Sequence, residues 1–309
     1  MRPLPTLRQL RYLAALAEHR HFGRAADDCC VTQSTLSAGL RELEDVLGVS
    51  LVSRGNRQAA LTPVGEDIVV RARAILRDAE QLLDVACVGS QPLTGLLRLG
   101  VIPTIGPYLL PRAMPAVRTT YPGLRLYLRE ERTARVLDLL QSGRLDAGLI
   151  ALPYATGELE TLTLGCDPLL VACSAAHRFA VRGWAASAEL MAEPLLLLED
   201  GHCLREHGLT ACRLLPGLAN EDLQATSLST LVQMVASGLG LTLVPLLAVD
   251  VEIRREPALA AVPFRDERPA REIALVWRPD SVRSRDLHLL GEVLRESLPS
   301  MAASGSLGE

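Results

Sequence analysis

The fold of the N-terminal quarter is decided by one stretch, Thr32-Gln33-Ser34-Thr35-Leu36-Ser37-Ala38-Gly39-Leu40-Arg41-Glu42-Leu43-Glu44-Asp45-Val46-Leu47-Gly48. Its leucines follow the i, i+4, i+7, i+11 spacing that places them on one face of a helix. Thr32 is a favourable N-cap, so we predict a helix over residues 33–47. The other faces carry short polar side chains and one arginine, namely Gln33, Ser34, Thr35, Ser37 and Arg41. This polar surface suits a helix lying in the major groove of DNA.

The segments on either side of this helix indicate a helix-turn-helix. Small residues dominate Phe22-Gly23-Arg24-Ala25-Ala26-Asp27-Asp28-Cys29, which predicts a short helix, and a turn follows at Cys30-Val31. Residues 51–57 and 60–62 predict a two-stranded wing with Arg54 and Arg57 at its tip. Residues 1–60 hold eight arginines against six acids, so this domain is only mildly basic. A helical hairpin with a solvated polar face is the alternative.

A long helix is predicted to begin at Thr62-Pro63, since proline is favoured at the first helical position, and to run to about Ala86. Its apolar residues form one narrow stripe: Ile68, Ile75, Ala79, Leu82 and Ala86. Such a helix usually pairs with another. No other segment offers a matching stripe, so we predict that it pairs with its own copy. The resulting homodimer would match a roughly palindromic DNA site.

Beyond a polar break at residues 89–92 the pattern changes to alternating strands and helices. Apolar runs predict seven strands: Leu96–Ile102, Leu124–Leu128, Ala147–Ala151, Leu169–Cys173, Leu195–Leu198, Leu241–Val244 and Ile273–Trp277. Because helical segments lie between them, we expect an α/β architecture with largely buried strands.

The composition of the chain limits the classes of protein to which it can belong. The chain has 309 residues, 49% hydrophobic content and a formal net charge of −4, so it can bury sizeable cores in two or three domains and has no overall basic field. No apolar run approaches the ~20 residues that a membrane span needs. Arg8 and Arg11 interrupt the only early apolar stretch, which argues against a signal peptide. We therefore expect a cytoplasmic protein, in which a disulfide is usually transient, catalytic or sensory.

A pair of cysteines stands in a chemically distinctive setting. Cys203 follows His202, lies near arginines, and precedes Cys212 by nine positions. Positive charge or a helix N-terminus increases the population of the nucleophilic thiolate, and the sulfenic acid that a peroxide produces condenses with a second thiol. This pattern suggests a peroxidatic and a resolving cysteine. Two alternatives stay open: buried core cysteines, and a zinc site formed by His202, Cys203, His207 and Cys212.

The spacing of the two cysteines has a geometric consequence. Nine residues of helix separate their ends by about 13.5 Å along the axis. A disulfide needs Cα atoms within roughly 7 Å of each other. If a helix lies between Cys203 and Cys212, the bond can form only when that helix is remodelled, so the segment is a candidate switch.

The residues carry a family resemblance over nearly the whole chain. At the N-terminus it rests on Leu16-Ala17-Glu18-His19-Arg20-His21-Phe22, Arg24-Ala25-Ala26-Asp27 and the segment from Gln33 to Val49. These segments resemble the LysR-type transcriptional regulators. Three later segments resemble the hydrogen-peroxide-sensing members of that family: residues 103–111, residues 198–205 and Ala225-Thr226-Ser227-Leu228.

The resemblance implies a division into domains. A winged helix-turn-helix DNA-binding domain would span residues 1–61, a dimerising linker helix residues 62–90, and a redox-sensing regulatory domain residues 91–309. The regulatory domain would be a two-lobed α/β structure like a periplasmic binding protein, with lobe I at 91–165 and 270–300 and lobe II at 166–269. The family assembles as a tetramer.

The resemblance also implies roles for single residues. Cys203 would be the peroxidatic thiol and Cys212 the resolving one. The residues around the peroxide would be Thr104, Thr133, His202, Glu206 and Arg278, with Arg278 lending positive charge. Glu206 departs from the aspartate, and Asp222 from the histidine, that the family often has. An anion near the thiol would raise its pKa.

The partners implied are promoter DNA, RNA polymerase, hydrogen peroxide as the signal, and glutaredoxin or thioredoxin as the reductant, in the cytoplasm and nucleoid of a bacterium. No metal and no cofactor is expected. One alternative is a regulator whose interlobe cleft binds a small organic ligand, with structural cysteines only. Another is a thiol peroxidase, but the first 90 residues would then have no role and no other catalytic constellation is present, so we expect no enzyme.

Overall fold

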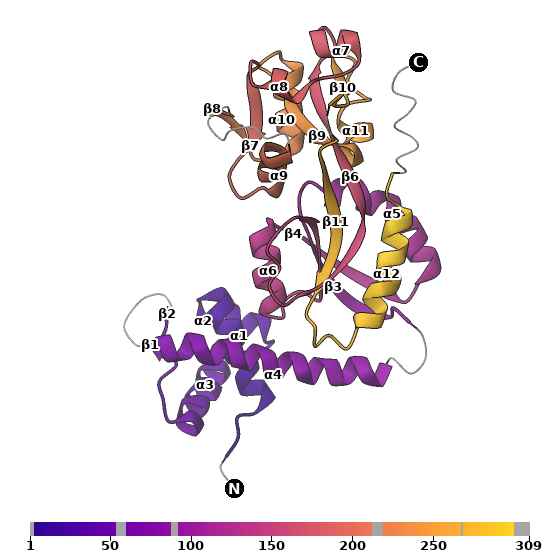
Figure 1. The fold of residues 1–309 in the computed structure, drawn as a ribbon. Helices are drawn as coiled ribbons and strands as arrows, with labels where there is room; N and C mark the ends of the chain where they lie inside the picture. The colour runs from indigo at the N-terminus through magenta and orange to yellow at the C-terminus, as the bar shows by residue number, and fades with distance from the viewer. Residues whose placement is uncertain (1–2, 54–59, 88–91, 212–218, 267, 300–309) are drawn as a thin grey trace. The chain divides into compact units, whose positions relative to one another are not determined.

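The computed structural model describes residues 3–53, 60–87, 92–211, 219–266 and 268–299. The chain divides into two compact units, Met1–Ser90 and Gln91–Glu309. Figure 1 traces their elements in chain order.

The N-terminal unit contains three short helices followed by a small hairpin and a long helix. The short helices are α1 (Leu7–His19), α2 (Phe22–Asp28) and α3 (Gln33–Leu47). The predicted helix over residues 33–47 is therefore confirmed, with Thr32 as its N-cap and Gly48 in the left-handed conformation at its end. Leu36, Leu40 and Leu43 are buried in a core shared with α1.

The predicted wing strands are present. Strand β1 (Val52–Ser53) pairs antiparallel with β2 (Ala60–Leu61), and Val52 lies opposite Leu61. The arginines predicted at the wing tip, Arg54 and Arg57, lie outside the described residues.

Helix α4 (Pro63–Cys87) matches the predicted long helix, but the single apolar stripe was an incomplete description. Val69 and Ala72 are buried against the core of the N-terminal unit. Ile75 and Leu82 remain 48% and 71% exposed. The helix thus has two apolar stripes. One packs into the core of the N-terminal unit, and the other is exposed on its surface.

The second unit begins with a parallel sheet. Strand β3 (Gly95–Val101) lies between β4 (Leu124–Glu130) and β5 (Ala147–Leu152), parallel to both. The connecting helices are α5 (Gly106–Thr120) and α6 (Thr133–Gln141). On the far side of β5 follow β11 (Ala270–Trp277) and β6 (Glu160–Ser174), both antiparallel to their neighbours.

A second lobe is built on the far half of β6. There β6 pairs with β9 (Thr242–Pro245) on one side and with β10 (Leu259–Val262) on the other. Strand β7 (Leu195–Leu198) pairs parallel with β8 (Ala219–Ala225) and bridges to Leu241 beside β9. Figure 1 shows β6 and β11 running lengthwise through the unit from one lobe towards the other.

Helices cover both lobes. Those of the second lobe are α7 (Arg178–Arg182), α8 (Ser187–Leu190), α9 (Cys203–Ala211), α10 (Leu228–Ala236) and α11 (Leu246–Glu252). The last helix, α12 (Ser284–Glu296), returns to the first lobe and packs on α5 and β6. All seven predicted strands are present. Strands β8 and β10 and the first half of β6 were not predicted.

Candidate DNA interface and redox site

The polar face of α3 is available to a ligand of the N-terminal unit. Gln33, Ser34, Thr35 and Arg41 are exposed and Ser37 is half-buried. Thr32 fixes the start of the helix, because its hydroxyl accepts the N–H of Thr35 at 3.2 Å. Gly39 lies directly against the ring of Tyr12 in α1, where a Cβ atom would come within 2.7 Å. This close approach holds the polar face of α3 in a fixed position.

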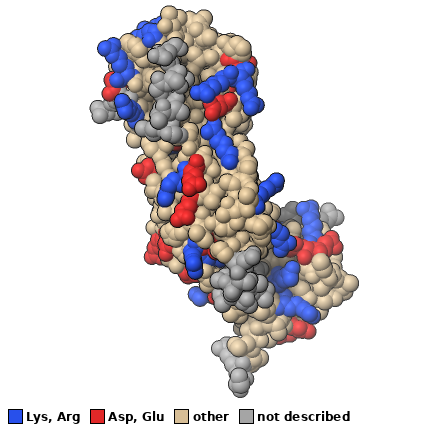
Figure 2. Space-filling view, turned by 90° about the vertical axis from the view of Figure 1, so that its right-hand side faces the viewer, with Lys and Arg blue, Asp and Glu red and all other residues tan. Residues whose placement is uncertain are grey.

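The charge on the molecule is dispersed. Figure 2 shows acidic and basic side chains interspersed over the face in view. Attraction to a polyanion must therefore come from a few local arginines such as Arg41, because the formal charge of the whole chain is −4.

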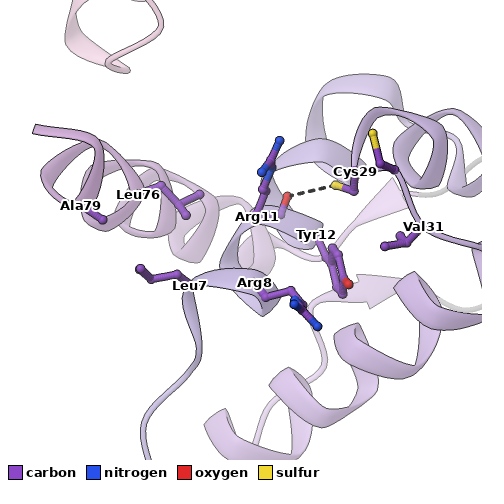
Figure 3. Close-up of a pocket in the computed structure, with 9 residues that line it drawn as sticks. Leu7, Arg8, Arg11, Tyr12, Cys29, Val31, Leu76 and Ala79 are labelled. Carbon is purple, nitrogen blue, oxygen red and sulfur yellow. Dashed lines mark hydrogen bonds between the residues drawn. The ribbon is translucent and has the colours of Figure 1, made fainter. Parts of the chain in front are cut away.

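A cavity of about 820 Å³ lies in the N-terminal unit between α1, α4 and the turn after α2 (Figure 3). Arg8 and Arg11 line it together with Leu76 and Ala79 of α4. The Cys29 thiol donates to the Arg11 carbonyl oxygen at 4.0 Å, and burial raises its pKa. No residue predicted to bind DNA or peroxide lines this cavity.

In the second unit, Cys203 is the first residue of α9 and is only 4% exposed. The chain reaches it from β7 through residues 199–202, in which Gly201 adopts φ +87°, a conformation that favours glycine. Burial of the thiol raises the pKa of Cys203. The charge of Arg271 and a contact with the Thr133 hydroxyl act in the opposite direction.

Arg271 is fully buried in β11 and rigidly held. Its Nε donates to Asp167 Oδ2 at 3.0 Å. Nη1 donates to the Thr104 hydroxyl at 2.7 Å, and Nη2 to the Thr104 carbonyl oxygen at 2.8 Å. Asp167 in β6 accepts in addition the N–H of Leu247 at 3.0 Å. A guanidinium fixed at all three nitrogens presents a positive charge to the thiol without reorganisation.

Two buried hydroxyl groups belong to the candidate site, one bound to Arg271 and one near the thiol. Thr104 Oγ1 accepts from Arg271, so its own hydrogen is left to donate elsewhere. Thr133, the first residue of α6, is 1% exposed. Its hydroxyl makes no well-formed hydrogen bond within the described residues, although it interacts with the Cys203 thiol. The Thr133 hydroxyl can therefore bind a small polar molecule beside the sulfur, while the Thr104 hydroxyl is held by Arg271.

His202 is buried, and its electrostatic surroundings keep it neutral. Burial and the charge of Arg132 hold the pKa of His202 below its usual range, while Glu199 opposes them. Arg132 itself donates to the Asp200 carbonyl oxygen at 3.0 Å and to Glu199 Oε2 at 2.9 Å. The loop that precedes the thiol is thereby joined to the start of α6.

His207 lies one helical turn beyond Cys203. Its Nε2 is 2.8 Å from the carbonyl oxygen of Pro153 and therefore carries the proton and donates it. Burial lowers the pKa of His207. Among the residues that the structure describes, no group of three or more His, Cys, Asp or Glu could hold a metal ion. Cys212 of the alternative zinc site lies outside the described residues.

Of the residues predicted to surround a peroxide, Thr133 interacts with the Cys203 thiol. Thr104 is connected to the thiol only through Arg271, to which it is hydrogen-bonded. Glu206 is exposed and influences the thiol only through its charge, which raises the pKa of Cys203. Asp222 is in β8.

Arg278 is not placed with them. Its Nη1 donates to the carbonyl oxygens of Leu140 and Leu145, at 2.6 and 2.9 Å, in the first lobe. Arg278 follows Arg271 by seven positions and lies just after β11, which corresponds to about 23 Å of extended chain at ~3.3 Å per residue. The cation whose charge lowers the pKa of Cys203 is Arg271, which the sequence did not lead us to predict. Arg271 could have been recognised as a buried cation, because it is a single arginine at the edge of an apolar strand and Asp167 can pair with it from a second buried strand.

No helix in the described part of the chain is long and apolar enough to cross a membrane.

Comparison with protein families finds two matches. Residues 7–66 match the model of the bacterial regulatory helix-turn-helix protein, lysR family, and residues 90–299 match the LysR substrate binding domain. Curated relatives match over almost their whole length. The DNA-binding transcriptional dual regulator OxyR of Escherichia coli is 43% identical over 291 residues, 94% of each chain. The HTH-type transcriptional regulator EstR of Acinetobacter baylyi is 38% identical over 295 residues, 96% of this chain and 98% of its own.

Solved structures resemble the same span. A full-length OxyR from Pseudomonas aeruginosa, with a cysteine replaced by aspartate, superposes with a TM-score of 0.79 at 38% identity, covering 97% of this chain and 100% of its own. A cysteine-to-serine OxyR from Corynebacterium glutamicum with hydrogen peroxide bound gives a TM-score of 0.67 at 35% identity, covering 99% and 96%.

Proposed function

The chain belongs to the LysR family of DNA-binding transcriptional regulators, and from this premise we propose that it senses hydrogen peroxide through Cys203 and Cys212 and thereby switches antioxidant genes. The observation that carries the proposal is the buried Cys203 thiol, on which the positive charge of Arg271 and a contact with the buried Thr133 hydroxyl both act. The peroxide bound to the Corynebacterium glutamicum relative supports the choice of signal.

In the first step, hydrogen peroxide binds beside the thiol and accepts hydrogen bonds from Thr104 and Thr133. The Cys203 thiolate attacks one peroxide oxygen, the O–O bond breaks, and a sulfenic acid forms on the sulfur. The departing hydroxide takes up the proton that the thiol released and becomes water. Arg271 stabilises both the thiolate and the negative charge that develops on the leaving oxygen.

In the second step, the Cys212 thiol displaces water from the sulfenic acid and a disulfide forms. Helix α9 opposes this step, because it is continuous from Cys203 to Ala211 and so separates these two residues by about 12 Å. One further residue adds or subtracts at most about 3.8 Å between Cα atoms. The bond requires Cα atoms within roughly 7 Å, so α9 must lose at least its last turn.

The DNA-binding surface is proposed to comprise the polar face of α3 and the two wing arginines Arg54 and Arg57. The open stripe of α4, with Ile75 and Leu82, supports pairing with a second copy as a homodimer. Pairs of dimers would form a tetramer. Residues 1–61, 62–90 and 91–309 would then read DNA, dimerise and sense peroxide, with the lobes at 91–165 plus 270–300 and at 166–269.

The switch would act in the bacterial cytoplasm. Its output would be altered contact with RNA polymerase at the promoter. Glutaredoxin or thioredoxin would return the disulfide to two thiols by supplying two electrons, as a transient disulfide in a reducing compartment requires.

Differential alkylation and mass spectrometry test the proposal. Reduced full-length protein is given a near-stoichiometric pulse of hydrogen peroxide, and each cysteine is assigned as thiol or disulfide. We expect a rapid Cys203–Cys212 disulfide that dithiothreitol reverses. Cys203→Ser should abolish it, whereas Cys212→Ser should leave a long-lived sulfenic acid on Cys203. If both thiols stay reduced while the protein binds DNA, a small organic ligand becomes the expected signal.

A further inference from the structure

Arg132 connects the two lobes at the redox site. It immediately precedes α6 in the first lobe, and its guanidinium donates to two consecutive residues of the second lobe. Nη1 lies 3.0 Å from the Asp200 carbonyl oxygen and Nη2 lies 2.9 Å from Glu199 Oε2. Both acceptors belong to the short loop between β7 and Cys203. The residue after Arg132 is Thr133, whose hydroxyl meets the thiol.

We propose that Arg132 is a positioning residue for the reaction of Cys203 with peroxide: it holds the loop of residues 199–202 against the start of α6 and keeps the thiol against Thr133. This inference rests on the proposed function of Cys203. The same contact makes the first step fast and the second step slow, because the thiol must be in place for oxidation and must leave that place for disulfide formation.

The geometry of the contact favours positioning over simple charge attraction. Two hydrogen bonds from one rigid fork to adjacent residues fix the orientation of the loop as well as its distance. The guanidinium also lies on Gly201, where a Cβ atom would be 3.3 Å from Nη1. The backbone of the loop therefore passes directly beneath Arg132. A lysine could retain the charge but could not form this two-point contact.

A second arginine touches the same loop and differs in one respect. Arg205 pairs with Asp200 at 3.1 Å and donates to the Leu198 carbonyl oxygen at 3.2 Å. All of these partners belong to the same lobe as Arg205. Its contacts therefore stabilise the loop within its lobe, whereas those of Arg132 hold the loop to the hydroxyl in the other lobe.

Arg132→Ala should have opposite effects on the two steps. Sulfenic acid formation should slow by about tenfold, since small misplacements at a reacting centre cost one to two orders of magnitude. Conversion of the sulfenic acid to the disulfide should accelerate, because the loop no longer has to break from α6. A loss of stability alone would not slow sulfenic acid formation and at the same time accelerate disulfide formation. The Arg132 side chain is half-exposed, so the substitution should be compatible with folding.

The experiment measures both steps in full-length protein. Sulfenic acid formation is followed by dimedone trapping in the Cys212→Ser background, and disulfide formation is followed in protein with both cysteines. The variants are Arg132→Ala, Arg132→Lys and a matched control, Arg135→Ala. Arg135 lies in the first turn of α6, and its ion pair, with Asp138 at 3.9 Å, does not involve the loop. We expect Arg132→Lys to resemble Arg132→Ala, and Arg135→Ala to resemble the unaltered protein.

Hydrogen exchange on the reduced protein provides a readout that needs no peroxide. Arg132→Ala should increase exchange at the amides of residues 199–203, while Arg135→Ala should not. Equal rates for Arg132→Ala and Arg135→Ala in both chemical steps would overturn the positioning role, as would parallel slowing of both steps. If the unaltered protein forms no sulfenic acid, the proposed function fails; increased exchange in Arg132→Ala would then still support the loop contact, and unchanged exchange would remove that too.

Discussion

The candidate DNA-reading surface and the candidate redox site are built in opposite ways. The candidate DNA contacts of α3 lie within nine consecutive positions of one helix, from Gln33 to Arg41. The redox site draws Thr104, Thr133, Cys203 and Arg271 from four segments far apart in the chain, and Asp167 from a fifth. A site on one helix is specified by local periodicity, whereas an assembled site depends on the whole fold. The following predictions test this contrast.

The largest effect is expected for Arg271→Met. It leaves the Asp167 carboxylate buried without its partner, which should destabilise the regulatory unit by about 3–5 kcal/mol. It also removes the cation beside Cys203, so the reaction with peroxide should slow by about 100-fold. Urea unfolding and dimedone trapping measure the two effects. In the control, Arg278→Met should leave the peroxide rate unchanged; if it slows that rate as much, Arg271 is not the cation that matters.

Leu43→Ala should disable the N-terminal unit alone. Leu43 is fully buried in the core under α3, and its truncation should cost about 2–5 kcal/mol. Affinity for operator DNA should fall with the loss of that unit, while Cys203 keeps its peroxide reactivity. Val49→Ala, at a residue 40% exposed, is the control and should change unfolding by no more than about 0.5 kcal/mol. Loss of peroxide reactivity in Leu43→Ala would contradict the independence of the two sites.

The peroxide reaction should depend on pH in a direction set by burial. Burial raises the pKa of Cys203, so the thiol is protonated at pH 7 and the reactive thiolate is the minor form. The rate should rise about tenfold between pH 7 and pH 8. Stopped-flow rates at a series of pH values measure this profile.

Glu206→Gln gives the matched test of the pH profile. The negative charge of Glu206 raises the pKa of Cys203, so the variant should shift the profile towards lower pH and react faster at pH 7. A rate that has already levelled off below pH 7 in the unaltered protein would show an acidic thiol and refute the dominance of burial.

The smallest effect is expected for Arg41→Ala. Loss of one phosphate contact should reduce the slope of log affinity against log salt by about one. Fluorescence anisotropy on operator DNA at several salt concentrations measures the slope. Arg125→Ala, an exposed arginine in β4 of the regulatory unit, should leave it unaltered. Equal slopes for Arg41→Ala and the unaltered protein would exclude α3 as the phosphate-contacting face.

The accuracy of the sequence predictions follows the same division. Helix α3, its cap and the wing strands depend on neighbours within a few residues, and all were predicted correctly. The linker helix was predicted in length, but not the burial of Val69 and Ala72, because that burial requires knowledge of α1. Strand β8, Ala219–Ala225, is too polar to be recognised from its apolar content.

The redox site could be predicted only in part. Cys203 and the two threonines stood in recognisable motifs. The cation was misassigned because arginines flank both ends of the apolar run of β11, and periodicity does not reveal which end meets the thiol. Only the pairing of β11 with β6, which places Arg271 opposite Asp167, distinguishes Arg271 from Arg278.

The two long strands β6 and β11 run between the lobes, and the buried Arg271–Asp167 pair joins one strand to the other. A rotation of one lobe against the other would twist these two strands, one of which carries Arg271, whose charge lowers the pKa of Cys203. The same two strands therefore affect both the relative position of the lobes and the reactivity of Cys203. A rotation between the lobes would change the pKa of the Cys203 thiol by moving the charge of Arg271.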